Sequence, residues 1–157
     1  MNTPSTPSAK LGVLTGPFGS QAAARGLSTK TIFDEQRFDT ALDILSAFRA
    51  AGADIGVTPT WGANVRGPDP AEAFGDDHRE WNRRAARAAK AVFGKRPVYG
   101  SIAPILNTSG ADDAGWAALP HPAGWAAERH EPQVRALRAA GVDTLLLEAC
   151  RYFGEAA

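Results

Sequence analysis

The chain has 157 residues, of which 44% are hydrophobic, and its 17 basic and 17 acidic side chains give a formal net charge of zero. This length fits one domain with a proper core, and the balanced charge gives no reason to expect nucleic acid or an acidic membrane as a partner. No stretch approaches the ~20 apolar residues of a membrane helix. The single cysteine excludes an internal disulfide framework and favours a reducing, cytoplasmic location.

The amino-terminal part of the chain predicts a tail, a strand and a short helix. Residues 1–10 are rich in proline, serine and threonine and are expected to form a flexible tail, so that the domain covers residues 11–157. Residues 11–14 are apolar and predict a first strand, which ends in a turn rich in glycine and proline. A short helix is expected over residues 21–26, and a loop is expected to follow it.

Three longer helices are predicted from apolar residues at helical spacing. They cover residues 38–51, 78–93 and 123–140, and the last is expected to break near Pro132 because proline removes a backbone donor. In the second helix, the predicted buried stripe consists of Trp81, Ala85, Ala88, Ala89 and Val92. Basic residues lie largely off that stripe, which indicates a solvated face.

Short apolar runs follow the helices at residues 55–57, 97–102 and 143–148, and predict three further strands. Strands that alternate with helices are typical of an α/β fold with a parallel sheet. The helix-to-strand segments 48–54 and 137–143 are similar to each other, which fits either an ordinary αβ loop or a repeat of a βα-barrel.

Polar residues follow each predicted strand. Thr15, Thr58, Ser101 and Glu148 would share one face, the active-site face, if the strands belong to a βα-barrel. Glu148 is the most specific of them, because a carboxylate placed directly after three leucines would be partly desolvated and would need a partner. The alternative is that Glu148 meets water or caps the next helix.

The remaining candidate residues can each be interpreted structurally as well as functionally. Thr58 and Thr60 could contact a substrate, but a threonine in a turn often bonds local backbone instead. Trp61 could form the floor of a pocket or simply pack in a loop, and Asn64 could orient a substrate or hold its own turn. Cys150, beyond the last strand, fits a small buried apolar side chain better than a nucleophile or ligand.

No local motif indicates a metal or nucleotide site. The three histidines, His78, His121 and His130, have no ligand-like spacing, whereas a zinc site needs about four ligands. The chain has neither a P-loop nor a G-x-G-x-x-G motif, and no local motif suggests a Ser/His/Asp triad.

Four segments in succession resemble motifs of the homocysteine S-methyltransferase family. They are VLTGPFGS (13–20), AGADIGVTPTWGAN (51–64), the run from Asn82 through the strand VYGSIAP (82–104), and the run from Gln133 to Glu148. The second is similar to the family pattern A-G-A-D-[IV]-[IV]-x-T-N-T-[FY]-x-A-N nearly throughout. Each motif is weak alone, but their common order extends the resemblance from residue 11 to the end of the chain.

The resemblance implies half of a TIM-type (β/α)8 barrel, about four parallel strands with intervening helices, because a complete barrel takes about 250 residues. It also implies methyl transfer from a donor to the thiol of homocysteine, giving methionine, with Zn2+ holding the sulfur as a thiolate. Glu148 matches the family glutamate that holds the homocysteine amino group. The predicted substrate-binding residues are Glu148, Thr15, Gly16, Phe18, Thr58, Thr60, Trp61, Asn64 and Ser101.

The chain departs from the family pattern in ways that bear on activity. Thr15 stands where the family has an aspartate, Pro59 replaces an asparagine and Ala149 replaces a threonine. The three zinc-binding cysteines of the family lie in the second half of its barrel, and Cys150 matches none of them. No catalytic residue and no metal ligand is therefore assigned in this chain.

Three functions remain open from the sequence. The chain could supply the homocysteine pocket of a methyltransferase whose zinc comes from elsewhere, or it could be a catalytically silent binding or scaffolding half-barrel. It could also be a different βα enzyme that uses Glu148 as an acid or base. An open half-barrel would favour a homodimer or a complementing second half-barrel, since unpaired strand edges promote association.

Overall fold

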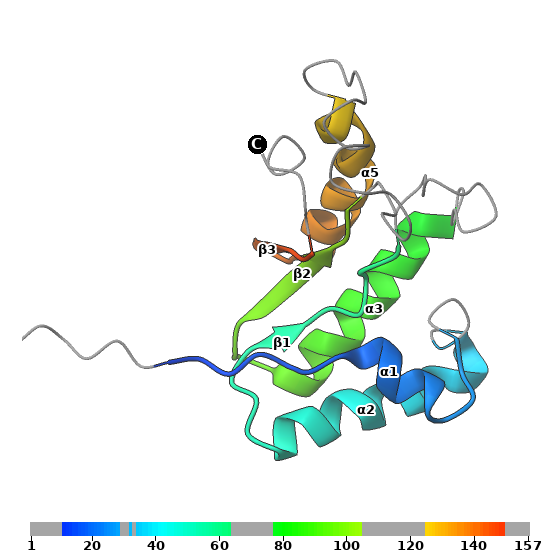
Figure 1. Cartoon of the computed structure of the whole chain (residues 1–157), viewed down its shortest axis with the longest axis vertical. Coiled ribbons are helices and arrows are strands. Elements are labelled where there is room, and N and C mark those ends of the chain that lie inside the picture. The colour runs from blue at the N-terminus through cyan, green and yellow to red at the C-terminus, as the bar shows by residue number, and fades with distance from the viewer. Residues whose placement is uncertain (1–10, 29–31, 33, 64–76, 105–124, 150–157) are drawn as a thin grey trace, which may run out of the picture.

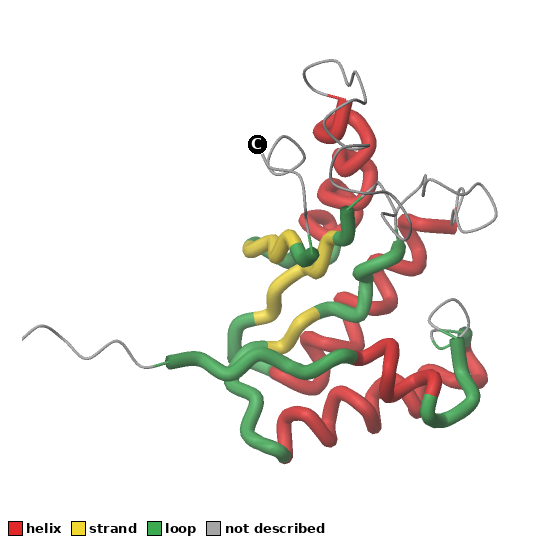
Figure 2. Tube along the Cα trace, in the orientation of Figure 1, coloured by secondary structure: helices red, strands yellow, loops and turns green. Residues whose placement is uncertain are grey.

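The computed structural model describes residues 11–28, 32, 34–63, 77–104 and 125–149. Asn64, Cys150 and the expected tail, residues 1–10, lie outside the described residues. The elements, drawn in Figures 1 and 2, are α1 (Phe18–Ala23), the 3₁₀ helix η1 (Glu35–Arg37), α2 (Phe38–Ala50), β1 (Gly56–Val57), α3 (His78–Phe93), β2 (Val98–Ile102), α5 (Trp125–Ala139) and β3 (Thr144–Leu147).

The three strands form one parallel sheet in the order β1-β2-β3. Gly56 lies opposite Val98, and Ser101 lies opposite Leu146. The crossover from β1 to β2 contains α3, and the crossover from β2 to β3 contains α5, so strand and helix alternate as the sequence predicted. Figure 1 shows α2 at the bottom of the view with α1 above it, α3 in the middle and α5 at the top.

The expected first strand is reduced to a single parallel bridge between Leu14 and Ile55. The Ile55 N–H donates to Val13 O at 3.0 Å, but the Val13 N–H turns to the Asp54 carboxylate at 3.4 Å instead of a main-chain carbonyl. Pro17 has no N–H with which to extend the ladder further. The sheet therefore contains three strands and one bridge where about four strands were expected.

The predicted helices are present, with two differences. The helix α3 has the predicted bounds and buries the whole predicted stripe. The helix α1 begins at Phe18, three residues before its predicted start. The helix α5 continues through Pro132, so the expected break is wrong. Pro132 leaves only the carbonyl of Glu128 without its helical donor, and Glu128 is exposed, so water can bond that carbonyl.

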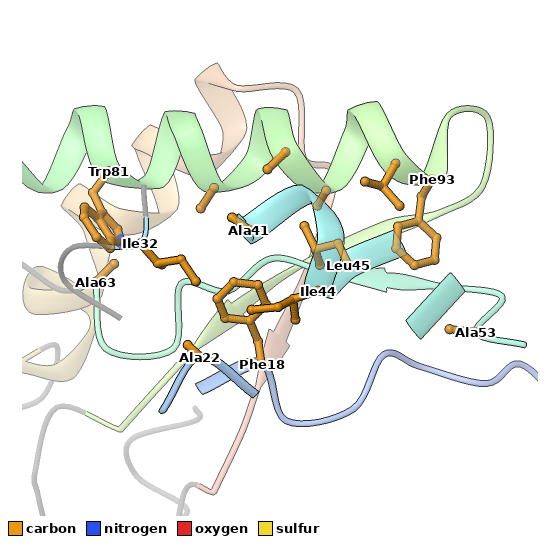
Figure 3. Close-up of a cluster of buried hydrophobic side chains, with 14 residues drawn as sticks. Phe18, Ala22, Ile32, Ala41, Ile44, Leu45, Ala53, Ala63, Trp81 and Phe93 are labelled. Atoms are coloured by element: carbon orange, nitrogen blue, oxygen red, sulfur yellow. The ribbon is translucent and has the colours of Figure 1, made fainter. Parts of the chain in front are cut away.

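A core of buried side chains joins α1, α2 and α3. Figure 3 shows it beneath α3, with Trp81 near one end of that helix and Phe93 near the other, and with Ile44 and Leu45 of α2 between them. A smaller cluster, Ala86, Ile102, Leu137 and Val142, joins α3, β2 and α5. These two clusters fix the helices against the sheet and so set the positions of the strand ends.

The two similar helix-to-strand segments fold in the same way. Gly52 has a φ of 106° and Gly141 has a φ of 77°, which is the left-handed backbone that ends a helix. In both segments the residue after the glycine donates its N–H to a carbonyl five residues earlier, at 3.1 Å. This Schellman arrangement directs each chain into the next strand with the same geometry.

Candidate functional site

A cavity of about 810 Å3 lies at the carboxyl ends of the strands. It is lined by residues from the turn after the first bridge, the loop after β1, and the ends of β2 and β3. The predicted site residues among them are Thr15, Gly16, Phe18, Thr58, Trp61, Ser101 and Glu148. Segments far apart in the sequence therefore meet at one place, as expected if the carboxyl ends of parallel strands share an edge.

Glu148 is the one charged side chain among the described residues that line the cavity. Its N–H donates to Ile102 O at 3.0 Å, which extends the pairing of β2 and β3 to the residue just past β3. The Ser101 hydroxyl donates to Glu148 Oε1 at 2.6 Å. This bond fixes a carboxylate at the cavity wall, where it can accept hydrogen bonds from a cationic ligand group.

The two threonines after β1 are buried and bonded to each other and to β2. Their hydroxyl oxygens lie 2.7 Å apart, and the Thr60 hydroxyl donates to Ser101 O at 2.7 Å. The Ser101 N–H donates to Thr58 Oγ1 at 3.0 Å. Thr58 lines the cavity, whereas within the described part of the chain Thr60 lies behind the lining and ties the loop to β2.

The turn after the first bridge closes one side of the cavity. Thr15 Oγ1 accepts the N–H of Val57 at 3.1 Å, so this hydroxyl joins the turn to β1. At Gly16 a Cβ atom would lie 2.8 Å from Cε1 of Phe48, so a larger residue would not fit there unless Phe48 moved. Phe18 is buried and belongs both to the cavity wall and to the core.

Trp61 and Trp81 give the cavity an aromatic wall. Trp81 is buried in the core, whereas Trp61 is 53% exposed and its main-chain oxygen accepts the N–H of Ala103 at 3.1 Å. The side chain of Trp61 is therefore accessible to a ligand, and its backbone holds the loop against the end of β2.

Two fully buried polar residues behind the cavity, Asn82 and Gln133, were given no role from the sequence. Gln133 Nε2 donates to Thr60 O at 2.7 Å, and Asn82 Nδ2 donates to Ala63 O at 2.9 Å. In the sequence both are polar residues on predicted apolar stripes, Asn82 beside Ala85 and Gln133 one turn before Leu137. That pattern is the signal that could have identified them.

The described residues do not provide the metal site that the family resemblance implies. No group of three or more His, Cys, Asp or Glu side chains in residues 11–28, 32, 34–63, 77–104 and 125–149 is arranged to hold a metal ion. In the same residues no helix is long and apolar enough to cross a membrane. The cavity as described is therefore a pocket with one carboxylate and no metal ligands beside it.

Comparisons with known proteins agree with this fold. The solved structures that match include a homocysteine methyltransferase, MmuM, from Escherichia coli in three forms. The oxidized form has a TM-score of 0.73 at 20% identity, with 94% of this chain and 56% of that chain covered. The metallated form gives 0.66 at 20% (92% and 56% covered), and the apo form gives 0.62 at 21% (94% and 52% covered). No curated protein sequence matches.

The chain thus has the α/β fold of part of a TIM-type barrel, and it spans about half the length of these structures. The family model described as homocysteine S-methyltransferase matches residues 13–157. The chain belongs to the homocysteine S-methyltransferase family.

Proposed function

We propose that this chain forms the amino-acid-binding half of a methyltransferase that transfers a methyl group to the thiol of homocysteine to give methionine. Family membership supports the reaction class, and the cavity supports the role of this half. The observation that carries the proposal is the Glu148 carboxylate, held by Ser101 at 2.6 Å at the wall of that cavity. An ammonium group is the ligand part that such a carboxylate would bind best.

The other walls suit the rest of an amino acid with a short apolar side chain. Leu14, Val57 and Leu146 line the cavity beside Phe18 and Trp81. We propose that they enclose the methylene groups of homocysteine, and that Thr15, Gly16, Thr58, Trp61 and Ser101 complete the pocket. We also propose Asn64 as a substrate-binding residue, as predicted from the sequence, and Thr60 as the residue that ties the β1 loop to β2 beside the pocket.

The methyl-transfer step needs groups that the described part of the chain lacks. The family uses Zn2+ to present the sulfur as a thiolate, and the cysteine ligands for it would come from a complementing second half-barrel, because the one cysteine of this chain matches none of them. Leu14 and Leu147, at the two outer edges of the sheet, are 41% and 42% exposed, which favours such pairing. We place the protein and its partner in the cytoplasm, with homocysteine and a methyl donor as substrates.

A catalytically silent half-barrel that binds or scaffolds another chain is the second candidate. One observation favours it: Thr15 stands in place of the family aspartate. A sulfur-methylation assay with added Zn2+ distinguishes the candidates. Methionine formed only after a second half-barrel is added supports the first, and no methionine under either condition supports the second. Turnover by the chain alone would contradict the proposal that the metal ligands come from elsewhere.

Substitution of Glu148 tests the binding role. We expect Glu148→Gln to weaken homocysteine binding by about tenfold, because a charge-assisted hydrogen bond to the amino group is lost. Binding is measured by titration calorimetry, with 4-mercaptobutanoate, which lacks the amino group, as a second ligand. That analogue should bind the variant and the original chain equally. Glu131→Gln, at an exposed carboxylate on α5, is the control. Unchanged homocysteine affinity in Glu148→Gln would show that Glu148 does not bind the amino group.

A further inference from the structure

Ser101 connects Glu148 to the rest of the site. Its hydroxyl holds the Glu148 carboxylate, and its main chain is fixed on both sides by the threonines of the β1 loop. The side-chain oxygen of Thr58, Oγ1, accepts the Ser101 N–H at 3.0 Å, and the Thr60 hydroxyl donates to Ser101 O at 2.7 Å. Any group that sets the relative position of this loop and Ser101 therefore also sets the direction of the Glu148 carboxylate.

Gln133 is the side chain that reaches both segments. It comes from α5, is 0% exposed, and donates from Nε2 to Thr60 O at 2.7 Å, with Ser101 O at 3.4 Å from the same nitrogen. The Thr60 carbonyl also accepts the Ala63 N–H at 3.0 Å. One amide group thus lies between the loop after β1 and the end of β2, and it belongs to the helix that leads into β3.

Asn82 supports Gln133 from α3. Its Nδ2 donates to His78 O at 2.8 Å and to Ala63 O at 2.9 Å, which fixes the orientation of its amide. Its Oδ1 then faces Gln133 Nε2 at 3.3 Å. The two amides join the two crossover helices to each other and to the loop that carries the threonines.

The amide of Gln133 is costly in this place. Its Oε1 is buried and has no hydrogen-bond partner in the described part of the chain, and such an acceptor costs about 1–3 kcal/mol. A methionine would fill a similar volume without this penalty. The NH2 group of the amide is therefore the part that stabilises this region, through its contacts with Thr60 O and Ser101 O beside the site.

We propose that Gln133, supported by Asn82, is a positioning residue that aligns Ser101, and through it the Glu148 carboxylate, for the amino group of the bound amino acid. The assignment of the ligand group rests on the proposed function above, whereas the alignment itself is a property of the free chain. The two parts can be tested separately.

The first test needs no ligand and uses hydrogen exchange of the whole chain. In Gln133→Met we expect the amides of Ser101 and Ala63 to exchange about tenfold faster, while the amides of α2 keep their rates. The control is Leu137→Val, a fully buried residue one turn further along α5, which should accelerate exchange without singling out those two amides. Unchanged rates at Ser101 and Ala63, or the control pattern in Gln133→Met, would overturn the alignment.

The second test uses homocysteine affinity. Gln133→Met should weaken homocysteine binding about tenfold and leave 4-mercaptobutanoate binding unchanged, whereas Leu137→Val should change neither in the folded protein. If Glu148→Gln weakens homocysteine binding but Gln133→Met does not, this inference fails and the proposed function stands. If the original chain does not bind homocysteine, the proposed binding function fails and the exchange test alone decides the alignment.

A second variant applies if Gln133→Met does not fold. In Gln133→Glu a protonated carboxyl group can donate its O–H to Thr60 O, but an ionised one cannot, and burial favours the protonated form. Relative to the original chain, protection of the Ser101 amide should be nearly complete at about pH 5 and should decrease towards about pH 8. If the protection of the Ser101 amide in Gln133→Glu, relative to the original chain, stays constant over this pH range, the proposed role of residue 133 as a hydrogen-bond donor is contradicted.

Discussion

Gly56 sets the distance between the sheet and α3. A Cβ atom at this position would lie 2.6 Å from Cδ2 of Phe93, whose side chain is buried at the end of α3. Neither can move easily, because one is main chain within a sheet and the other is packed in the core. Small size at this residue is therefore a requirement of packing.

We expect Gly56→Ala to lower the free energy of unfolding by about 1–3 kcal/mol, the usual cost of overpacking a core. Urea denaturation followed by circular dichroism measures it. Gly62→Ala is the matched control, since nothing lies within 4 Å of a Cβ built there. Equal stability of the two variants would show that the Phe93 side chain can move away from a Cβ atom at residue 56.

The polar residues at the strand ends were easier to predict than the helix residues behind them. Glu148 and Ser101 could be predicted because a polar side chain that directly follows a buried strand needs a hydrogen-bond partner or a ligand at that edge. Gln133 and Asn82 were given no role, since a single polar residue on an apolar helix stripe does not reveal its partner. Their partners are main-chain carbonyls of other segments, Thr60 O and Ala63 O, which become neighbours only after the chain has folded.

At the level of elements, cationic side chains hold the carboxyl ends of neighbouring helices. Arg49 of α2 donates to Val92 O near the end of α3, and Arg96 donates to Ala53 O just after α2 at 2.8 Å. Lys90 of α3 holds the end of α5 in the same way. The bond to Val92 O satisfies a carbonyl that α3 leaves without a helical partner, and all three side chains place positive charge at the negative end of a helix dipole.

Lys90→Met should therefore lower the free energy of unfolding by about 0.5–1 kcal/mol. Lys90 Nζ donates to Gly141 O at 2.7 Å and to Ala140 O at 3.2 Å, and methionine keeps most of the side-chain volume but not the donor. Thermal unfolding measures the change, and Arg87→Met on the exposed side of the same helix is the control. A loss no larger than in the control would contradict the capping role.

The first turn of α3 contributes to the stability of the fold in a pH-dependent way. Hydrogen bonds from Arg83 and then Arg84 favour the charged form of Glu80 and lower its pKa to about 2 from the ordinary 4.5. The resulting stabilisation is present above about pH 4.5 and is lost as pH falls towards 2. These three side chains are partly exposed to solvent, so their interaction contributes little to stability.

Glu80→Gln should accordingly lower the melting temperature slightly at about pH 7, and the difference should narrow as the pH is lowered to about 3. Melting curves of both proteins at several pH values measure it. A difference that stays constant over this range would mean that the charge of Glu80 does not contribute.

The helices were easier to predict than the edge of the sheet. The bounds of α3 followed from its apolar period, which packing against α2 and β2 preserves. The segment before Thr15 looked like a strand because it is apolar, but Val13 bonds the Asp54 side chain and Pro17 ends the ladder, so pairing stops at one bridge. Whether an apolar segment pairs into a sheet depends on the neighbouring strand, and the segment's own sequence does not reveal that neighbour.

For the whole molecule, the alternation of strand and helix together with the family motifs was sufficient to predict a partial barrel. A closed barrel leaves no strand edge, whereas the described sheet has two, near Leu14 and at β3. The structure brings the strand ends together without closing the barrel, and the cavity with Glu148 lies where those ends meet. We propose that this cavity holds the amino group of homocysteine.

A crystal structure of the chain grown with homocysteine tests this proposal. We expect the ligand in the cavity, with its amino nitrogen about 3 Å from a carboxylate oxygen of Glu148. We also expect the bond from Ser101 to Glu148 to be retained. A ligand bound elsewhere, or in the cavity with its amino group turned away from Glu148, would contradict the proposal.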